Sequence, residues 1–253
     1  MDAILSGIPG TAGYLNDIII VGRFPAELQD QVCAVLERVQ KYGFRLRAEK
    51  GQFFLDSITY LGFVFDVTGS HSDPENIRAI RQMPAPSNVS QLCSFLGLIS
   101  CFSAFLTSLH DVRAPLNRLL QKDAPWCWSS DCEKAFAQLK SMLSSDLLLT
   151  HYDPTLPIVV AADASNYGVG AVISHTFFDG SEKAIMHASR TLTPAEKNKG
   201  QIENEALALV FVVKKFHKLL YGRHFTLFTE HKPLLSIFGS KKGITIHSAS
   251  RLQ

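Results

Sequence analysis

The chain has 253 residues, of which 46% are hydrophobic and 19% charged, and its formal net charge at pH 7 is +2. This length and composition predict a globular protein with one large domain or two to three small ones. No apolar run approaches the ~20 residues of a membrane span, and no basic stretch followed by an apolar one marks a signal peptide. We therefore expect an intracellular protein of the cytoplasm or nucleus that has no membrane partner.

The N-terminal residues predict a helix end followed by a β-hairpin. Residues 1–5 have the pattern of the last turns of a helix, which glycine and proline then stop. Two β-forming runs, 11–15 and 18–21, flank Asn16 and Asp17. An Asn-Asp pair between two such runs is a hairpin signal.

The next elements are a helix and three short β runs. Apolar residues at helical spacing predict an amphipathic helix over residues 25–42. The β-forming runs that follow lie at residues 44–46, 52–55 and 59–65. In the last run we interpret Leu61, Phe63 and Phe65 first as sheet core.

Helices dominate the following part of the chain. Asp73 before a proline predicts a capped helix start, and the prolines within 84–86 end this helix. A second helix begins at Ser87 or Asn88. Further helices are predicted over residues 116–120 and 129–143.

A β-rich part begins after the proline-containing boundary at residues 154–157. A single carboxylate, Asp163, stands where the apolar run that begins with residues 158–160 ends. Gly168 and Gly170 supply turn and close-approach positions before a second apolar run, so we predict two antiparallel strands joined by a tight bend. On its plainest interpretation this is an ordinary hairpin whose turn Asp163 caps. A third strand over 183–189 and a capping box at 193–196 follow.

Two further acids stand at the ends of predicted elements. Residues 202–220 predict a long helix with Glu205 in its first turns, and the β run 225–229 ends at Glu230. If the strands pair and the helix crosses their sheet, both acids converge with Asp163. Clustered carboxylates of this kind are what two Mg²⁺ ions need for phosphodiester hydrolysis.

The five cysteines are odd in number and lie mostly in apolar, helical contexts. No spacing among them forms a CxxC motif with a histidine partner. We therefore interpret them as reduced core thiols rather than as a disulfide framework or a zinc site. They are Cys33, Cys93, Cys101, Cys127 and Cys132.

Three motifs carry a family resemblance. AADASNYGVGAVISH, QIENEALALVFVVKKF and LFTEHKPLLSIF, in this order and spacing, resemble the RNase H domain of gypsy-type LTR retrotransposon polyproteins. Upstream, YLND before IIIVG resembles the YxDD box of reverse transcriptases, and FLGLISCFSAFL resembles their thumb helices.

The resemblance covers essentially the whole chain and implies an α+β fold. Residues 1–68 are then the C-terminal part of a reverse transcriptase palm, and residues 69–150 a helical thumb and connection. Residues 151–253 are an RNase H-like domain with a mixed, five-stranded type of sheet, which we expect to be incomplete at its C-terminus.

The activities that the resemblance implies are RNA-directed DNA synthesis and cleavage of RNA in RNA–DNA hybrids, with Mg²⁺ or Mn²⁺ as cofactor. Asp163 would bridge both ions, Glu205 would hold one, and Glu230 stands where the family has aspartate. Asn16 stands where the YxDD box has its first aspartate, which leaves Asp17 alone and removes a charge from the polymerase metal site. The family's other palm aspartate precedes this box and is not in the sequence. We therefore expect no primer extension and weak or absent hybrid cleavage.

The implied partners are RNA–DNA hybrid or duplex nucleic acid and the rest of the Pol polyprotein. Leu61 and Gly62 lie in YLGFVFD, which resembles the hairpin that grips the primer strand. The basic residues expected to contact backbone phosphates are Lys214, Lys215, Lys218 and Arg223. A solvated helix face explains these charges equally well.

Two alternatives to a working enzyme stay open. The first is a non-catalytic nucleic-acid-binding or interaction remnant of a retroelement whose metal sites have decayed. The second is a decaying element copy without a selected role.

Overall fold

The computed structural model describes residues 2–15, 17–143, 148–229, 231, 233 and 234. The chain forms two compact units, Met1–Leu61 and Gly62–Gln253, which are described separately. The division of the chain into palm, thumb and RNase H-like parts at residues 68 and 150 stays a prediction. Among the described residues, no helix is long and apolar enough to cross a membrane.

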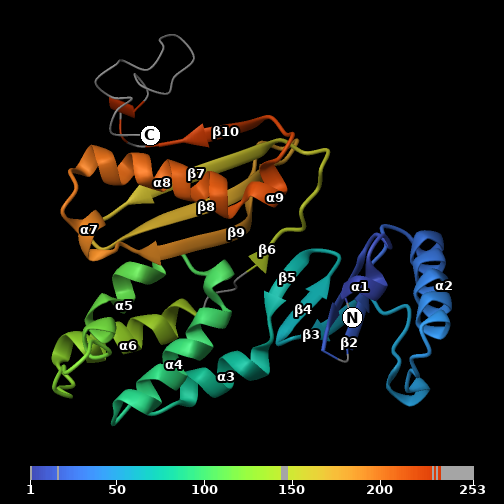
Figure 1. Cartoon of the computed structure of the whole chain (residues 1–253), viewed down its shortest axis with the longest axis horizontal. Coiled ribbons are helices and arrows are strands. Elements are labelled where there is room, and N and C mark those ends of the chain that lie inside the picture. Colours follow the sequence, from blue (N-terminus) through green and yellow to red (C-terminus); the bar gives the residue numbers. More distant parts are fainter. Residues whose placement is uncertain (1, 16, 144–147, 230, 232, 235–253) are drawn as a thin grey trace. The chain divides into compact units, whose positions relative to one another are not determined.

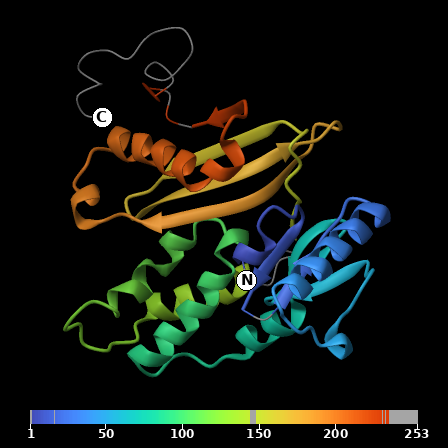
Figure 2. The ribbon, with the colours of Figure 1, turned by 45° about the vertical axis from the view of Figure 1, so that its right-hand side comes forward.

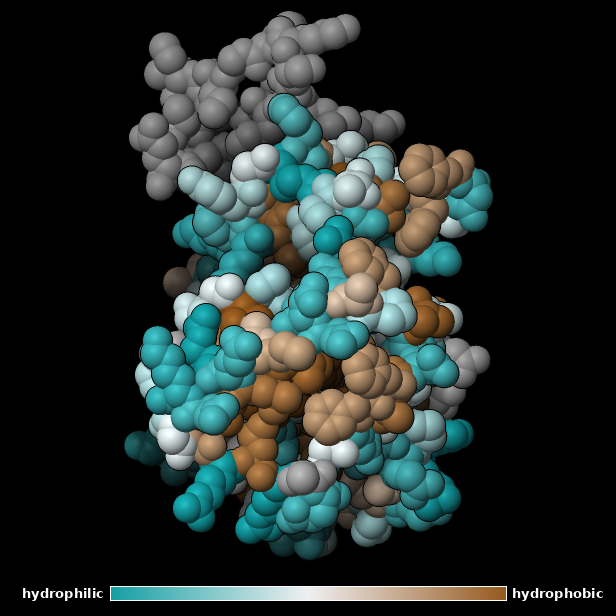
Figure 3. Space-filling view, turned by 90° about the vertical axis from the view of Figure 1, so that its right-hand side faces the viewer, coloured by the Kyte–Doolittle hydropathy of each residue, from teal (hydrophilic) through white to brown (hydrophobic). Residues whose placement is uncertain are grey.

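The N-terminal unit contains a hairpin, one long helix and little core. Its elements are α1 (Asp2–Leu5), β1 (Thr11–Tyr14), β2 (Asp17–Ile20), α2 (Pro25–Lys41), the 3₁₀ helix η1 (Ala48–Lys50) and β3 (Ser57–Tyr60). β1 pairs with β2 in antiparallel fashion and Tyr14 lies opposite Asp17, so the predicted hairpin is confirmed. The buried hydrophobic residues of this unit are Leu5, Ile8, Val35 and Val39. Hydrophobic side chains are visible between polar ones on the face that carries α2 (Figure 3).

Two of the three β runs predicted in this region are wrong. Residues 44–46 and 52–55 form no strand, and Phe44, Phe53 and Phe54 are all about half exposed. A β-forming run becomes a strand only where another strand offers hydrogen bonds and side-chain contacts, and these runs have no such neighbour. The third run is interrupted, because Leu61 and Gly62 have positive φ angles of 52° and 82° and form a turn. Leu61 is 52% exposed, so its interpretation as sheet core is also wrong.

The second unit begins with a small antiparallel sheet and a group of helices. These elements are β4 (Phe63–Asp66), β5 (Gly69–Ser72), α3 (Pro74–Gln82), α4 (Val89–Cys101), η2 (Ser103–Phe105), α5 (Leu109–Arg118), α6 (Ser130–Met142) and β6 (Leu148–Leu149). The predicted helix starts are confirmed by their caps, since Asp73, Asn88 and Ser129 each accept a hydrogen bond from a backbone N–H of the first turn. β5 pairs with both β4 and β6.

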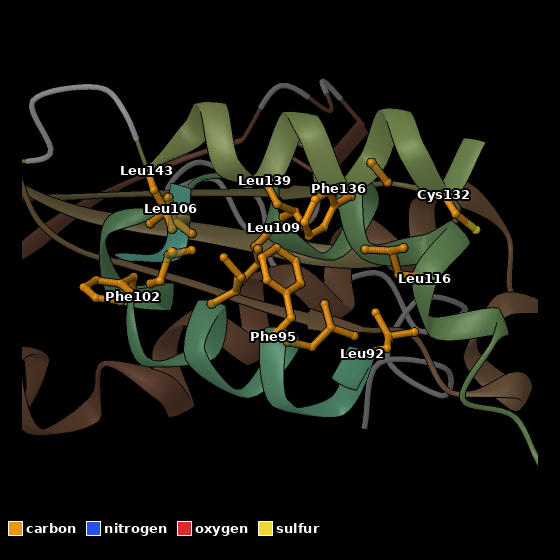
Figure 4. Packing of buried hydrophobic residues seen from close by; sticks show 14 of the residues in the cluster. Leu92, Phe95, Phe102, Leu106, Leu109, Leu116, Cys132, Phe136, Leu139 and Leu143 are labelled. Atoms are coloured by element: carbon orange, nitrogen blue, oxygen red, sulfur yellow. The ribbon is translucent and has the colours of Figure 1, made fainter. Parts of the chain in front are cut away.

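The helices of this unit share one hydrophobic core. Phe95 of α4 and Phe136 of α6 lie with their ring centroids 4.6 Å apart, and leucines from α4, α5 and α6 surround them (Figure 4). Phe63 of β4 packs against Phe102 and Phe105, with ring centroids 5.6 and 5.4 Å away. The apolar stripe of α4 is therefore core, as its helical spacing predicts.

The rest of the second unit is a four-stranded mixed sheet, in the part of the chain that the structure describes, where the resemblance predicts five strands. Its elements are β7 (Ile158–Ala164), β8 (Gly168–Thr176), β9 (Glu182–Thr191), α7 (Pro194–Lys197), α8 (Gln201–Lys215), α9 (His217–Leu220) and β10 (Phe225–Phe228). The strand order is β10-β7-β8-β9, with β10 parallel to β7 and the other pairs antiparallel. We call these strands the RNase H-like sheet. α8 lies across one face of it (Figures 1 and 2).

Two features near α8 differ in how well the sequence predicts them. The capping box is confirmed, because Thr193 Oγ1 accepts from Glu196 N and Glu196 Oε2 accepts from Thr193 N, at 3.3 and 2.8 Å. The single helix over 202–220 is wrong, because α8 ends at Lys215 and α9 begins at His217. Phe216 between them has φ −99° and ψ 16° and is buried in the core, where it fixes the break.

The cysteines are all free, as predicted, but only Cys132 is buried. The interpretation of Cys33, Cys93, Cys101 and Cys127 as core thiols is wrong. A helical context does not say which face of the helix a residue occupies, and these four lie at exposed positions.

Candidate active site

Asp163 lies next to the end of β7, on the sheet face away from α8. Ala162 and Ala164 belong to the core beneath α8, and side chains alternate along a strand, so Asp163 projects to the other face. Its cross-strand neighbour is Gly170 of β8, which in turn lies opposite Ser189 of β9. The Asp163 carboxylate is exposed.

Glu205 approaches the same end of β7 from the side of α8. It is only 7% exposed, in the second turn of the helix. The side-chain amide of Gln201 donates to Glu205 Oε1 at 2.9 Å and to the Ala164 carbonyl at 3.1 Å. Gln201 therefore ties the buried carboxylate to the strand residue next to Asp163. Gln201 was not predicted from the sequence, although it precedes Glu205 by four residues and so lies on the same helix face.

The third predicted acid cannot be placed in this geometry. β10 runs parallel to β7, with Phe228 opposite Ala161, so its C-terminal end points toward the end of β7 that carries Asp163. Glu230 itself lies outside the described residues, and its role stays a prediction. Among the residues that the structure does describe, no group of three His, Cys, Asp or Glu side chains could hold a metal ion.

Two residues of α5 lie beside Asp163 and were not predicted. His110 Nε2 is 3.3 Å from Ser165 Oγ and 3.3 Å from Asp111 Oδ2, while Ser165 Oγ donates to Asp111 Oδ1 at 2.6 Å. Ser165 Oγ also accepts from the backbone N–H of Gly168, which fixes the bend between β7 and β8. The signal for this group is tertiary, since α5 is more than fifty residues upstream.

The histidine also explains why the bend contains glycine. A Cβ atom on Gly168 would overlap Cδ2 of His110 and stand 2.5 Å from the Arg190 carbonyl oxygen. The prediction of Gly168 as a close-approach position is thus confirmed. Burial lowers the pKa of His110, while the charges of Asp111 and Asp163 act in the opposite direction. The net lowering keeps the imidazole neutral at pH 7.

The predicted polymerase residues are only partly described. Asp17 is the first residue of β2 and is exposed beside the hairpin turn. Asn16 lies outside the described residues. Their roles stay predictions.

The predicted nucleic-acid contacts divide into exposed and internal groups. Lys214, Lys215 and Lys218 are all exposed around the end of α8 and on α9. Arg223 donates to Tyr152 Oη at 3.1 Å and to the Leu156 carbonyl at 3.0 Å, which gives it an internal role. Gly62 lies in the turn after β3, with its carbonyl accepting from Asp73 N.

The chain is similar to known proteins over most of its length. The family described as "RNase H-like domain found in reverse transcriptase" matches residues 128–227. The Pol polyprotein from transposon gypsy of Drosophila melanogaster is 32% identical over 234 residues, which cover 87% of this chain and 22% of the relative. That from Drosophila transposon 412 is 29% identical, over 89% of this chain and 18% of the relative. The Tf2-3 polyprotein of Schizosaccharomyces pombe is 27% identical, over 88% and 17%. The chain thus spans about a fifth of the length of these relatives.

Solved structures resemble the chain in fold. A foamy viral protease-reverse transcriptase dRH in complex with double-stranded DNA has a TM-score of 0.76 and 21% identity, covering 99% of this chain and 45% of that one. The protease-reverse transcriptase in complex with an RNA/DNA hybrid has a TM-score of 0.75 and the same identity, covering 99% and 35%. The α+β fold class is confirmed. The family match and these relatives support a fragment of a retrotransposon Pol polyprotein that contains an RNase H-like domain.

Proposed function

We propose that this chain binds RNA–DNA hybrid or duplex nucleic acid and acts on hybrids as a weak, metal-dependent ribonuclease. The Pol relatives support the class of activity, and the two foamy viral neighbours are complexes with double-stranded DNA and with an RNA/DNA hybrid. The five free cysteines fit a reducing compartment, so the site of action is intracellular, in the cytoplasm or nucleus. The remainder of a Pol polyprotein is the expected protein partner.

The observation that carries the proposal is that two carboxylates, Asp163 and Glu205, lie near the same end of β7, one on each side of the sheet. Asp163 is exposed on one side of the end of β7, and Gln201 holds Glu205 against the same end from the other side. Carboxylate oxygens are the donors that Mg²⁺ prefers, and the ion is usually bound by one or two carboxylates together with waters and substrate phosphates. The residues therefore fit the donor chemistry of a Mg²⁺ ion, which Asp163 and Glu205 would hold. Such an ion would supply an activated water and neutralise charge on the phosphate.

The chain's own residues fix how this site is approached. Gln201 orients Glu205, so that one carboxylate oxygen is already committed to an amide donor. His110 and Asp111 stand on the face to which Asp163 projects and narrow the approach to it. Glu230, where the resemblance expects aspartate, would carry its charge one methylene farther out. Because Mg²⁺ demands near-ideal geometry and a misplacement of ~1 Å can cost on the order of 10²-fold in rate, we expect slow cleavage.

The deciding experiment is metal-dependent cleavage of an RNA–DNA hybrid. The unmodified chain should cleave slowly, faster with Mn²⁺ than with Mg²⁺, and Asp163→Asn should abolish cleavage. Glu230→Asp should raise the rate. Asp179→Asn is the matched control, because Asp179 caps an exposed turn of the same domain through Ser181 and should leave the rate unchanged. Cleavage that persists in Asp163→Asn would overturn the assignment of the site.

Binding is tested separately through the three exposed lysines. If Lys214, Lys215 and Lys218 contact phosphates, log affinity for a duplex should fall with log salt by about 0.9 per phosphate neutralised. Replacing all three by glutamine should flatten this slope, whereas Lys197→Gln on α7 should not. A slope that the triple variant leaves unchanged would identify the lysines as a solvated surface.

A second candidate function is non-catalytic nucleic-acid binding, and the two substitutions at predicted metal ligands, Asn16 and Glu230, favour it. Hybrid binding without cleavage in either metal would select this alternative. Primer extension is not expected, because Asn16 supplies no charge to a polymerase metal site. Templated incorporation of a labelled nucleotide above that of an Asp17→Ala variant would contradict this expectation.

A further inference from the structure

A polar cavity of about 270 Å³ lies where η2 and α5 pack against β9. Its volume is at the small end of the range for small-molecule pockets. Hydroxyl, amide and guanidinium groups line it, and no carboxylate does: they include Ser100, Ser103, Arg113, Asn117, Ser189 and Thr191. Such a lining favours a small anion over an apolar ligand.

Arg113 lines this cavity and has no acidic partner among the residues that the structure describes. Its Nη1 donates to Ser100 Oγ at 2.9 Å, and its Nε is buried and has no hydrogen-bond partner. Burial lowers the pKa of the guanidinium, but arginine stays charged at neutral pH. Arg113 as a whole is half-buried, and a partly desolvated charge without a counter-charge would be stabilised by an anion that entered the cavity.

The second arginine at the cavity differs from Arg113 because it has an acidic partner. Arg190 donates from Nη1 and Nη2 to the two carboxylate oxygens of Glu196, at 2.8 and 2.9 Å, and is therefore neutralised within the protein. Among the described residues, Arg113 therefore combines an unpaired Nε–H donor with a charge that has no acidic partner.

We propose that this cavity binds a phosphate-class oxyanion, with Arg113 as the counter-charge and the surrounding hydroxyls as additional donors. The planar guanidinium matches the geometry of phosphate oxygens. The residues that line this cavity include none of the carboxylates or lysines used in the proposed function, although His110 joins it to the end of β7 through Ser165. Ser189 is in register with Asp163 through Gly170, on the same sheet face. A free phosphate and a backbone phosphate of a bound nucleic acid are therefore both possible sources of the oxyanion.

The test uses the full chain and inorganic phosphate. Phosphate should raise the melting temperature in a saturable manner, above the effect of chloride at equal ionic strength, because a ligand that binds only the folded state stabilises it. Arg113→Gln should weaken phosphate binding by about tenfold or more, the loss expected for a charged hydrogen bond. Arg118→Gln is the matched control, since Arg118 is an exposed arginine at the end of the same helix.

Two further arms complete the test. Arg113→Lys keeps the charge and should retain part of the affinity, which answers the objection that Arg113→Gln is merely misfolded. The line width of the ³¹P signal of inorganic phosphate reports whether a short RNA–DNA hybrid displaces the ion from the cavity. Displacement identifies a backbone phosphate as the occupant, whereas undisturbed phosphate binding identifies the free ion. Equal stabilisation by phosphate in the unmodified chain and in Arg113→Gln would overturn the site. This readout is independent of hybrid cleavage and of the lysine variants, so the two proposals can fail separately.

Discussion

The N-terminal unit and the RNase H-like sheet both contain β-forming apolar runs, but the two regions bury them very differently. In the sheet, Val160, Val169 and Ile173 are fully buried between neighbouring strands and α8. In the N-terminal unit, the aromatic side chains of the runs at 44–46 and 52–55 stay about half exposed. The difference teaches that β propensity describes a residue's fit to a sheet surface, and that the surface must be supplied by the rest of the fold.

The largest difference in stability between the two regions should come from truncating a hydrophobic side chain in each of them. Ile173→Ala in β8 removes a side chain with no exposure and should cost about 2–5 kcal/mol of unfolding free energy. Leu55→Ala in the N-terminal unit removes one that is 51% exposed and should stay within about 0.5 kcal/mol. Urea denaturation of both variants makes the comparison. Similar losses would mean that the N-terminal run is buried in solution.

A smaller effect should follow from glycine substitution. Gly168→Ala forces a Cβ against His110 and the Arg190 carbonyl and should cost about 1–3 kcal/mol, as overpacking does. Gly97→Ala is the control, because Gly97 lies within α4 with open space around its Cβ position. It should stabilise the protein by about 0.5–1 kcal/mol. A stabilising Gly168→Ala would show that His110 does not pack on the bend.

The pH dependence of stability should differ between two ion pairs, one from each region. The Arg190 guanidinium lowers the pKa of Glu196 to about 2 from 4.5, so the pair's contribution is complete above about pH 4.5 and is lost as the pH falls toward 2. Glu196→Gln should remove about 1–3 kcal/mol at pH 7 and flatten this part of the profile. Glu27→Gln should have a smaller effect, because Glu27 pairs with Arg23, whose side chain is 84% exposed. Titration of both glutamates by NMR checks the order.

The smallest effect concerns helix caps. Asp73→Ala should cost about 1 kcal/mol, because the Asp73 carboxylate accepts from Glu75 N at the start of α3. The N-cap residue of α2 in the N-terminal unit is Phe24, which has extended geometry and makes no side-chain cap hydrogen bond to the described residues. Phe24→Ser should therefore stabilise the chain by about 0.5–1 kcal/mol. Thermal melts of the two variants should shift in opposite directions.

Local patterns predict several helix starts of the second unit and the elements that carry two acids of the candidate site. The caps at Asp73, Asn88 and Ser129 follow from short-range chemistry, since a side-chain oxygen before an apolar periodic run satisfies a nearby N–H group wherever the helix lies. The strand that ends at Asp163 and the helix that begins before Glu205 follow from periods of two and 3.6 residues. Gln201 was missed because a polar residue in a first turn gives no sign of the strand carbonyl that it reaches.

By itself the sequence determined the helix starts, the N-terminal hairpin, the order of the three acidic motifs and the resemblance to retrotransposon Pol polyproteins, because these depend on neighbouring residues. Only the tertiary structure decided which β runs become strands, which face of β7 carries Asp163 beside His110, and where the helix over 202–220 breaks. It also decided that Arg223 serves the fold while Arg113 has no counter-charge in the described part of the chain. The physical reason is common to all four: burial, pairing and charge compensation are set by residues far away in the chain, whose identity no local pattern contains.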